Sequence, residues 1–227
     1  MRYIGTCGFL YGHWREIFYP KSLKKEDFME FYFKHFNSLE INSTFYKMPT
    51  ENVLKKWKRV SKGKKLSIKV HNSVTHFGLD YKKANDFINF FSILQDRIGA
   101  FLFQLPASCK YNFLFIKNFI ENLNKDFKIA IEFREKHWYN PKVYDFLRKN
   151  NIAMVWHDFN QPFVNVKTAN FVYMRFHGYL ENYKGSYPDE FLDFAIKYKK
   201  GFFYFNNTLD GSAIKDAKRL QELDKKN

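Results

Sequence analysis

The sequence predicts an α/β fold, a TIM-type (β/α)8 barrel, on the strength of three observations. Short β-rich runs recur eight times, and apolar residues at helical spacing fill most of the segments between them. The chain has 227 residues, slightly fewer than the roughly 250 typical of this barrel. No linker rich in Gly, Ser or Pro interrupts it. We therefore expect one barrel domain over residues 1–227.

The eight runs are short and rich in β-branched and aromatic residues, as barrel strands are. They lie at 3–7, 38–42, 66–71, 99–104, 128–133, 152–156, 171–176 and 201–206. Helix starts are marked locally, for example where Asn140-Pro141 supplies a cap followed by proline at the first helical position. The segment 157–170 is too polar for a normal helix, so we expect an irregular connection between strands six and seven. An open, doubly wound sheet is the alternative, because the alternation alone does not show closure.

Charge and composition give a weaker indication of function. The formal net charge is +15, which favours an anionic partner such as a phosphorylated molecule or a nucleic acid. The basic residues are scattered, however, and Lys, Asn and Phe are abundant together. All three have codons rich in A and T, so genome composition is a competing explanation of the charge.

The cysteines and the hydropathy indicate the compartment. Cys7 and Cys109 are the only two cysteines, too few for a disulfide framework and without the paired spacing of a zinc site. No uninterrupted apolar run reaches the length that spans a membrane. We expect a cytoplasmic protein that does not bind membranes; the sequence does not indicate its oligomeric state.

Polar residues gather where the predicted strands end. Alternate side chains of a strand share a face, so polar residues two apart near a C-terminal end can both point into the mouth of a barrel. Barrel enzymes build their active sites at this end. Such residues are Glu40, Asn42, Lys69, His71, Gln104, Glu132, Arg134, Arg175, His177 and Asn206. A structural ion pair explains any one strand end, but a functional site explains their repetition better, because burying several charges is costly.

Arginine usage makes this placement more selective. Only eight of the 38 basic residues are arginines, and two of them, Arg134 and Arg175, close strands five and seven. Guanidinium binds a carboxylate or phosphate through two parallel hydrogen bonds. With Lys69, the two arginines are candidates to hold an anion. In the competing assignment Glu40 and Glu132 simply neutralise both arginines.

The strand-end motifs, in this order, resemble the YecE-like family, the domain of unknown function seventy-two, over nearly the whole chain. The motifs are Gly5-Thr6-Cys7-Gly8, Trp14, Phe18-Tyr19-Pro20, Glu40-Ile41-Asn42-Ser43-Thr44-Phe45-Tyr46, Lys69, Gln104-Leu105-Pro106, Glu132-Phe133-Arg134, Trp138, Asp158, Arg175-Phe176-His177-Gly178, Tyr187 and Phe205-Asn206-Asn207. The resemblance implies a TIM-type barrel and supplies no substrate. Cys7 stands where the family often has a small residue such as serine, and we expect a buried, inert thiol there.

The leading functional hypothesis is an enzyme that acts on an anionic, phosphorylated or nucleotide-like substrate at the mouth. Arg134, Arg175 and Lys69 are the predicted anion ligands, and Glu132 or His177, with Glu40, is predicted to handle protons and orient the substrate. The further predicted substrate-binding residues are Asn42, Gln104, Asn206, Tyr46, Trp138 and Tyr187. Replacing Arg175 with Ala is expected to abolish anion binding and leave the fold intact.

We expect neither a metal nor another cofactor. The spacing of the carboxylates and imidazoles matches no metal motif, and guanidinium groups beside the carboxylates oppose a cation. A two-carboxylate glycosidase is disfavoured for the same reason, because guanidinium lowers the pKa that a general acid needs raised. Any catalysis is therefore expected to be that of a metal-independent hydrolase or lyase. The second hypothesis is a binding module for nucleic acid or a phosphate ligand, without catalysis.

Overall fold

The computed structural model describes residues 1–226 and shows eight parallel strands that alternate with helices along the chain. Neighbouring strands follow the order β1-β8-β7-β6-β5-β4-β3-β2. The strands are β1 (Arg2–Thr6), β2 (Ser38–Ile41), β3 (Lys65–Lys69), β4 (Ile98–Leu105), β5 (Ile129–Phe133), β6 (Ala153–His157), β7 (Val172–Phe176) and β8 (Gly201–Phe205). All eight strands predicted from the sequence are present, displaced by at most two residues at either end.

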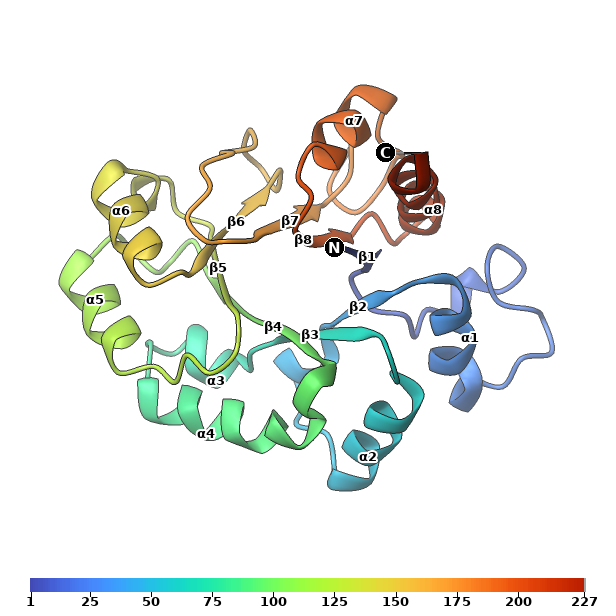
Figure 1. The fold of residues 1–227 in the computed structure, drawn as a ribbon, viewed down its shortest axis with the longest axis horizontal. Coiled ribbons are helices and arrows are strands. Elements are labelled where there is room, and N and C mark those ends of the chain that lie inside the picture. The colour runs from blue at the N-terminus through green and yellow to red at the C-terminus, as the bar shows by residue number, and fades with distance from the viewer. Residues whose placement is uncertain (227) are drawn as a thin grey trace.

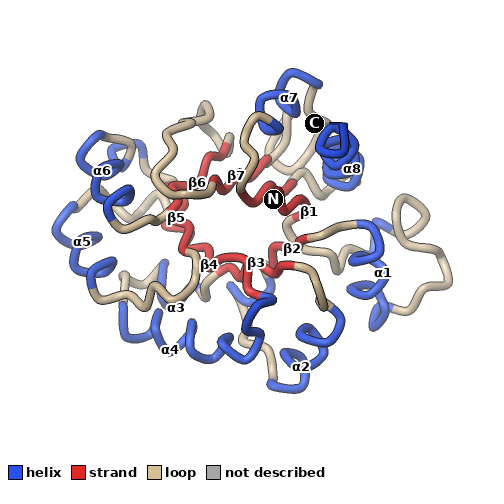
Figure 2. Tube along the Cα trace, in the orientation of Figure 1, coloured by secondary structure: helices blue, strands red, loops and turns tan. Residues whose placement is uncertain are grey.

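The helices cover the outside of the sheet. They are α1 (Phe28–His35), α2 (Glu51–Val60), α3 (Asn72–Thr75), α4 (Tyr81–Phe91), α5 (Phe113–Glu121), α6 (Pro141–Lys149), α7 (Asp189–Ile196) and α8 (Ser212–Lys226). Figure 1 shows them as a ring around the strands, and Figure 2 separates the inner strands from the outer helices by colour. No helix lies between β6 and β7, so the irregular connection expected there is confirmed. Within residues 1–226 no helix is both long and apolar enough to cross a membrane.

The barrel closes between β1 and β2 through a single bridge, which lies just beyond the C-terminal end of β1. Cys7 pairs with Glu40 in parallel register, and the Gly8 N–H donates to the Glu40 carbonyl oxygen at 2.8 Å. Below this bridge the strands approach closely, because a Cβ on Gly5 would lie 2.0 Å from the Ser38 carbonyl oxygen. Glycine at position 5 therefore permits closure, and the open-sheet alternative is wrong.

Strand alternation divides the buried residues into two sets. Side chains that point outward pack under the helices in the larger apolar core. Side chains that point inward form a smaller cluster inside the barrel, with Ala100, Ala130 and Ala153 facing bulky rings such as Tyr204. The next inward positions towards the C-terminal ends of the strands hold polar residues in place of this apolar layer, so the interior becomes charged at the mouth.

Candidate functional site

Five side chains from three strands meet at the C-terminal end of the barrel, and we call them the mouth cluster. They are Glu40, Glu132, Arg134, Arg175 and His177. Each occupies an inward position of β2, β5 or β7 or the residues that follow, as the alternation of each strand requires. All except Arg134 are buried.

Arg175 is the centre of the cluster, and protein groups accept all five of its N–H bonds. Nε and one Nη2 hydrogen bind the Glu40 carboxylate, with distances of 2.9–3.2 Å. Nη1 donates to Glu132 at 2.6 Å and to His177 Nε2 at 3.4 Å, and Nη2 also lies 3.7 Å from the Cys7 sulfur. A substrate can therefore bind Arg175 directly only by displacing one of these partners. The ion pairs expected if Glu40 and Glu132 neutralise the two arginines are therefore present.

The two carboxylates are held by different partners. Glu40 also accepts a hydrogen bond of 2.7 Å from the Tyr173 hydroxyl, so its two oxygens are occupied by Arg175 and Tyr173. One oxygen of Glu132 binds Arg134 and the other binds Arg175. Burial alone would raise the pKa of Glu132, but the charges of Arg134 and Arg175 outweigh it and hold that pKa well below its usual range. Glu132 is consequently a weak proton acceptor at neutral pH.

The surroundings of His177 fix its tautomer. Its Nε2 faces Arg134 Nη2 at 3.1 Å and Arg175 Nη1, and because guanidinium groups only donate, Nε2 accepts. The proton therefore lies on Nδ1, which donates to Asp158 Oδ1 at 3.2 Å. Burial lowers the pKa of His177 to about 3, although the hydrogen bond to Asp158 favours the charged form. Asp158 is itself fixed by the Tyr187 hydroxyl and by the His177 N–H.

Lys69 differs from the arginines because it has no carboxylate partner among residues 1–226. Its Nζ donates to the neutral Gln104 Oε1 at 3.0 Å and lies 4.0 Å from the centre of the Phe45 ring. Burial lowers the pKa of Lys69 to about 8, and the positive charge of Arg175 adds to this effect. The ammonium group is thus half-buried, with two N–H bonds that no described residue accepts.

Arg134 also keeps donors free. Its guanidinium stacks over the Phe159 ring at 3.8 Å and binds Glu132 through Nε. Its Nη1 has no hydrogen-bond partner in the part of the chain that the structure describes. The side chain is 12% exposed, so this nitrogen can meet a ligand at the mouth.

The remaining predicted site residues lie in different environments. Asn42, directly after β2, has a buried Oδ1 without a partner among the described residues. Asn206 is largely buried after β8, and its N–H donates to the Phe176 carbonyl oxygen at 2.7 Å. Tyr46 is 75% exposed on the loop after β2. Tyr187 is buried, with its hydroxyl bound to Asp158.

Trp138 lies on the loop after β5 and packs in the apolar core against the outer side of the barrel wall. Its ring is fully buried and stacks on Phe133 with a centroid distance of 4.9 Å. The indole N–H donates to the Cys109 carbonyl oxygen at 2.8 Å. No surface of this ring is open to a ligand in the structure, so a substrate contact would require the ring to move.

Sequence reasoning missed three side chains that shape the site. Tyr173 holds Glu40, and the Phe45 and Phe159 rings lie against the cations of Lys69 and Arg134. The alternation of β7 could have indicated Tyr173, because it lies two residues before Arg175 and shares its face. Phe45 lies within the motif that follows Glu40, but that motif gives it no role, and nothing in the sequence distinguishes Phe159 from the other phenylalanines.

The site offers no grouping of ligands for a metal. Within residues 1–226, no three His, Cys, Asp or Glu side chains gather in an arrangement that could hold a metal ion. The carboxylates of the mouth cluster point their oxygens at guanidinium groups instead. The groups at the mouth that remain available to an anion are therefore the N–H donors of Arg134, in the cluster, and of Lys69, beside it, for which no described residue is an acceptor.

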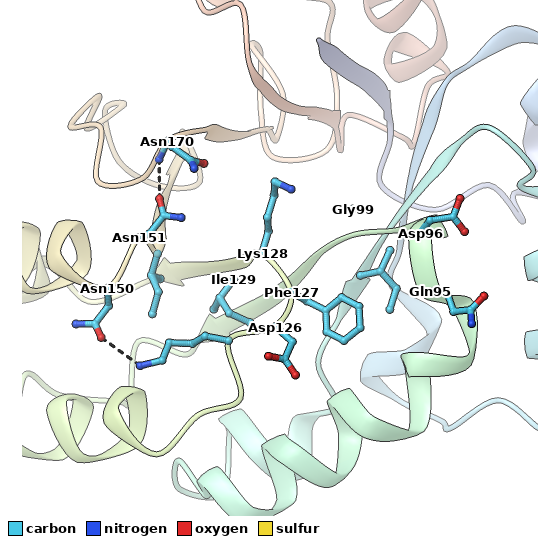
Figure 3. A pocket seen from close by; sticks show the side chains of 13 residues that line it. Gln95, Asp96, Gly99, Asp126, Phe127, Lys128, Ile129, Asn150, Asn151 and Asn170 are labelled. Carbon is cyan, nitrogen blue, oxygen red and sulfur yellow. Dashed lines mark hydrogen bonds between the residues drawn. The ribbon is translucent and has the colours of Figure 1, made fainter.

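A polar cavity of about 480 Å³ lies at the opposite end of the barrel, where β4 and β5 begin. Figure 3 shows its amide side chains, including Asn151, whose Oδ1 accepts from the backbone N–H of Asn170 at 2.8 Å, and Asn150, whose Oδ1 accepts from Lys125 Nζ at 3.3 Å. Barrel enzymes do not build their active sites at this end. We therefore place the candidate site at the mouth cluster.

The fold and the mouth cluster define the class of protein: a single (β/α)8 barrel that gathers charged side chains at the C-terminal ends of its strands. Within this class the chain belongs to the family described as "Protein of unknown function DUF72", whose model matches residues 3–227. The resemblance found in the motifs is thereby confirmed. None of the curated proteins matches the chain.

Solved structures of this family share the fold. A DUF72 family protein from Thermotoga maritima has a TM-score of 0.82 at 24% identity, covering 98% of both chains. One from Enterococcus faecalis also has a TM-score of 0.82, at 19% identity, covering 99% of this chain and 96% of the other. A second structure of the Enterococcus faecalis protein has a TM-score of 0.74. At these sequence identities the similarity shows that the fold is shared and nothing about function.

Proposed function

We propose that this barrel is an enzyme that binds an anionic, phosphorylated or nucleotide-like substrate at its mouth through Lys69 and Arg134. The observation that carries the proposal is the half-buried ammonium group of Lys69, whose one hydrogen-bond acceptor among residues 1–226 is the neutral Gln104. The nearest carboxylates, Glu40 and Glu132, act on Lys69 only from a distance and are paired with the arginines, and partly burying a cation without a direct ion-pair partner is costly. An anionic ligand supplies a direct ion-pair partner. Its binding therefore removes an unfavourable electrostatic free energy that the ligand-free protein has.

The neighbouring groups support an anion at this place. Arg134 Nη1 is free, and the contacts of the same guanidinium with Glu132 and Phe159 fix its direction. Arg175 binds both Glu40 and Glu132, so neither carboxylate presents an unpaired negative charge to the ligand. The unpartnered Asn42 Oδ1 accepts a hydroxyl group of the ligand, which satisfies a buried acceptor.

The proton-transfer group in this proposal is Lys69. Glu132 and His177, which the sequence suggested for this task, have pKa values far below neutral. The pKa of Lys69, about 8, is nearer to neutral pH than the pKa values of Glu132 and His177. The ammonium form, which a bound anion favours, donates its proton to the leaving group, and the neutral amine that remains takes a proton from the attacking water or from the substrate. This supports a metal-independent hydrolase or lyase.

Calorimetric titration with inorganic phosphate and with phosphorylated metabolites tests the proposal. Lys69→Met keeps most of the side-chain volume and removes the charge, so we expect binding to weaken at least tenfold. Lys215→Met, an exposed lysine on α8, is the matched control and should bind as the unaltered protein does. Equal affinity in both variants would refute the proposal. Turnover of a bound compound, lost in Lys69→Met, separates an enzyme from a binding module without catalysis.

A further inference from the structure

Two cavities lie side by side on the loops that follow β3 and β4, next to the mouth. The first has a volume of about 380 Å³ and is lined by His76 and Lys110, among others. The second, of about 360 Å³, is lined by Phe77 and by lysines at the start of α4. Gly78 and Leu79 line both. We call the two cavities together the loop groove.

The loop groove begins beside the proposed anion site. The ring of Phe45 lies 4.0 Å from Lys69 Nζ on one side and packs edge-on against His76, at a centroid distance of 4.8 Å, on the other. His76 lines the first cavity. A chain-like ligand with one phosphate at Lys69 can therefore continue past Phe45 into the groove.

Exposed aromatic rings flank this path. Phe77 is 83% exposed and Tyr46 is 75% exposed, although a protein gains stability by burying such rings. Tyr46 packs its ring edge-on against Phe45, while Phe77 lines the second cavity. Both rings offer a face on which a planar group can stack.

The charge of the loop groove is positive. Lys82, Lys83 and Lys110 line it, and all three are exposed or half-buried. Asp80 is the one acidic residue in the lining, and it is partly used within the loop. Its Oδ1 caps α4 by accepting the N–H groups of Lys82 and Lys83, and its Oδ2 lies 3.9 Å from Lys83 Nζ. Lys82 and Lys110 form no side-chain hydrogen bond or ion pair among residues 1–226, although Glu135 lies close enough to Lys110 to interact with its charge.

We propose that the loop groove binds single-stranded nucleic acid, with one phosphate at Lys69 and the flanking nucleotides along the groove. The inference rests on the function proposed for the mouth and extends it by naming the substrate class. Lysines that follow the backbone, together with aromatic rings that stack bases, are the combination by which proteins bind single strands without a sequence motif. A paired duplex hides the base faces that Phe77 and Tyr46 would contact.

Fluorescence anisotropy with 5′-phosphorylated oligothymidylates of two to eight nucleotides tests this proposal. We expect affinity to rise with length until the groove is filled. Phe77→Ala should weaken binding of the eight-nucleotide strand about 5- to 150-fold, the effect of losing one base–aromatic stack. Phe90→Ala, on the same loop-to-helix segment but outside both cavities, is the control. Lys82→Gln should lower the salt dependence by about one phosphate contact, and Lys117→Gln should not.

Two further probes distinguish base stacking from other causes of binding. An eight-unit abasic strand should bind about as weakly as the thymidylate strand binds Phe77→Ala; equal affinity for the abasic and thymidylate strands would overturn the proposal. An oligouridylate of the same length tests the sugar, and binding of either polymer supports the proposal. Phe77-dependent self-association in sedimentation velocity, with no oligonucleotide binding, would overturn it in favour of a second copy of the chain.

The variants also separate this inference from the function proposed for the mouth. If length and Phe77→Ala have no effect while phosphate binding still depends on Lys69, the loop groove inference fails alone. If Phe77→Ala weakens the oligonucleotide while Lys69→Met leaves phosphate binding unchanged, the groove is supported and the anion site at the mouth is refuted.

Discussion

Replacement of Arg175 by Ala tests the central claim about the mouth cluster, that this residue holds two buried carboxylates. The substitution removes the guanidinium donors of Glu40, which keeps the Tyr173 hydroxyl and the Cys7 thiol as partners, and it leaves Glu132 paired with Arg134. Breaking a buried ion pair by removing one partner costs about 3–5 kcal/mol. Glu40 loses the one cation that forms an ion pair with it among residues 1–226, so we expect the free energy of unfolding to fall by about that amount. The sequence alone led us to expect that Arg175→Ala leaves the fold intact; the contacts of Arg175 lead us to expect a large loss of stability.

Urea unfolding at pH 7, followed by far-ultraviolet circular dichroism, measures the loss. Arg134→Ala is the comparison, because that side chain is partly exposed and Glu132 keeps Arg175; we expect a loss of about 1–3 kcal/mol. Arg175→Lys, which restores one charge without the planar fork, should lie between the unaltered protein and Arg175→Ala. A loss below about 1 kcal/mol in Arg175→Ala would refute the reasoning, since a buried carboxylate without an ion-pair partner lowers the stability by more than this.

The dependence of this loss on pH gives a second check. Arg175 helps to hold the pKa of Glu132 well below its usual range, so the pair contributes stability above the pKa of the unfolded chain and loses it as pH falls. The difference between the unaltered protein and Arg175→Ala should therefore shrink between about pH 5 and pH 3. In the double variant Glu40→Gln/Arg175→Met no ionised Glu40 is left unpaired, and we expect it to be more stable than Arg175→Ala.

Four further predictions follow from individual side chains. Sulfate, whose charge does not change near neutrality, should bind less tightly as the pH rises above 8, by up to about tenfold per pH unit, because Lys69 loses its proton. Lys69→Met should remove this dependence on pH. Equal affinity of the unaltered protein for sulfate at pH 7 and pH 9 would contradict the proposed role of Lys69. The pKa of His177 is about 3, below the roughly 6.5 of an unfolded chain, so the neutral imidazole costs stability as pH falls from 6.5. Between pH 6.5 and 4.5 urea unfolding should show a loss of up to about 2.7 kcal/mol, and His177→Gln should lose less. Trp138→Phe should cost about 1–3 kcal/mol in thermal and urea unfolding, because the Cys109 carbonyl oxygen loses its donor, and should leave phosphate affinity unchanged. Gly5→Ala should destabilise the closure between β1 and β2 by about 1–3 kcal/mol or more, because the added Cβ meets the Ser38 carbonyl oxygen; a variant as stable as the unaltered protein would show that this contact relaxes freely.

The strands were predictable because their signal is local. A run such as Ile129–Phe133 shows its β-rich composition within five residues, and the alternation of side chains then places Glu132 and Arg134 on the inner face. The helices were predictable for the same reason, from apolar spacing and from caps such as Asn140. The side chains gathered at the strand ends therefore followed from the sequence together with the expected barrel.

The pairing within the mouth cluster was not predictable, because it depends on closure. Glu40 and Arg175 are 135 residues apart, and only the barrel brings β2 and β7 face to face. Whether Arg175 binds a ligand or two carboxylates is decided by this long-range geometry. Trp138 shows the same limit, since a ring that follows a strand by five residues is placed at the rim or in the wall only by its packing on Phe133.

The geometry of the mouth cluster also explains why a saturated arginine is useful at a binding site. Arg175 fixes Glu132, Glu132 fixes Arg134, and Arg134 then presents its free Nη1 in one direction. A donor that is already oriented loses little entropy when it binds a ligand. Lys69 is the complementary part, because its charge is the one in the site without a carboxylate partner among the described residues. Binding of an anion must therefore raise the pKa of Lys69, so that above pH 8 binding and proton uptake are coupled.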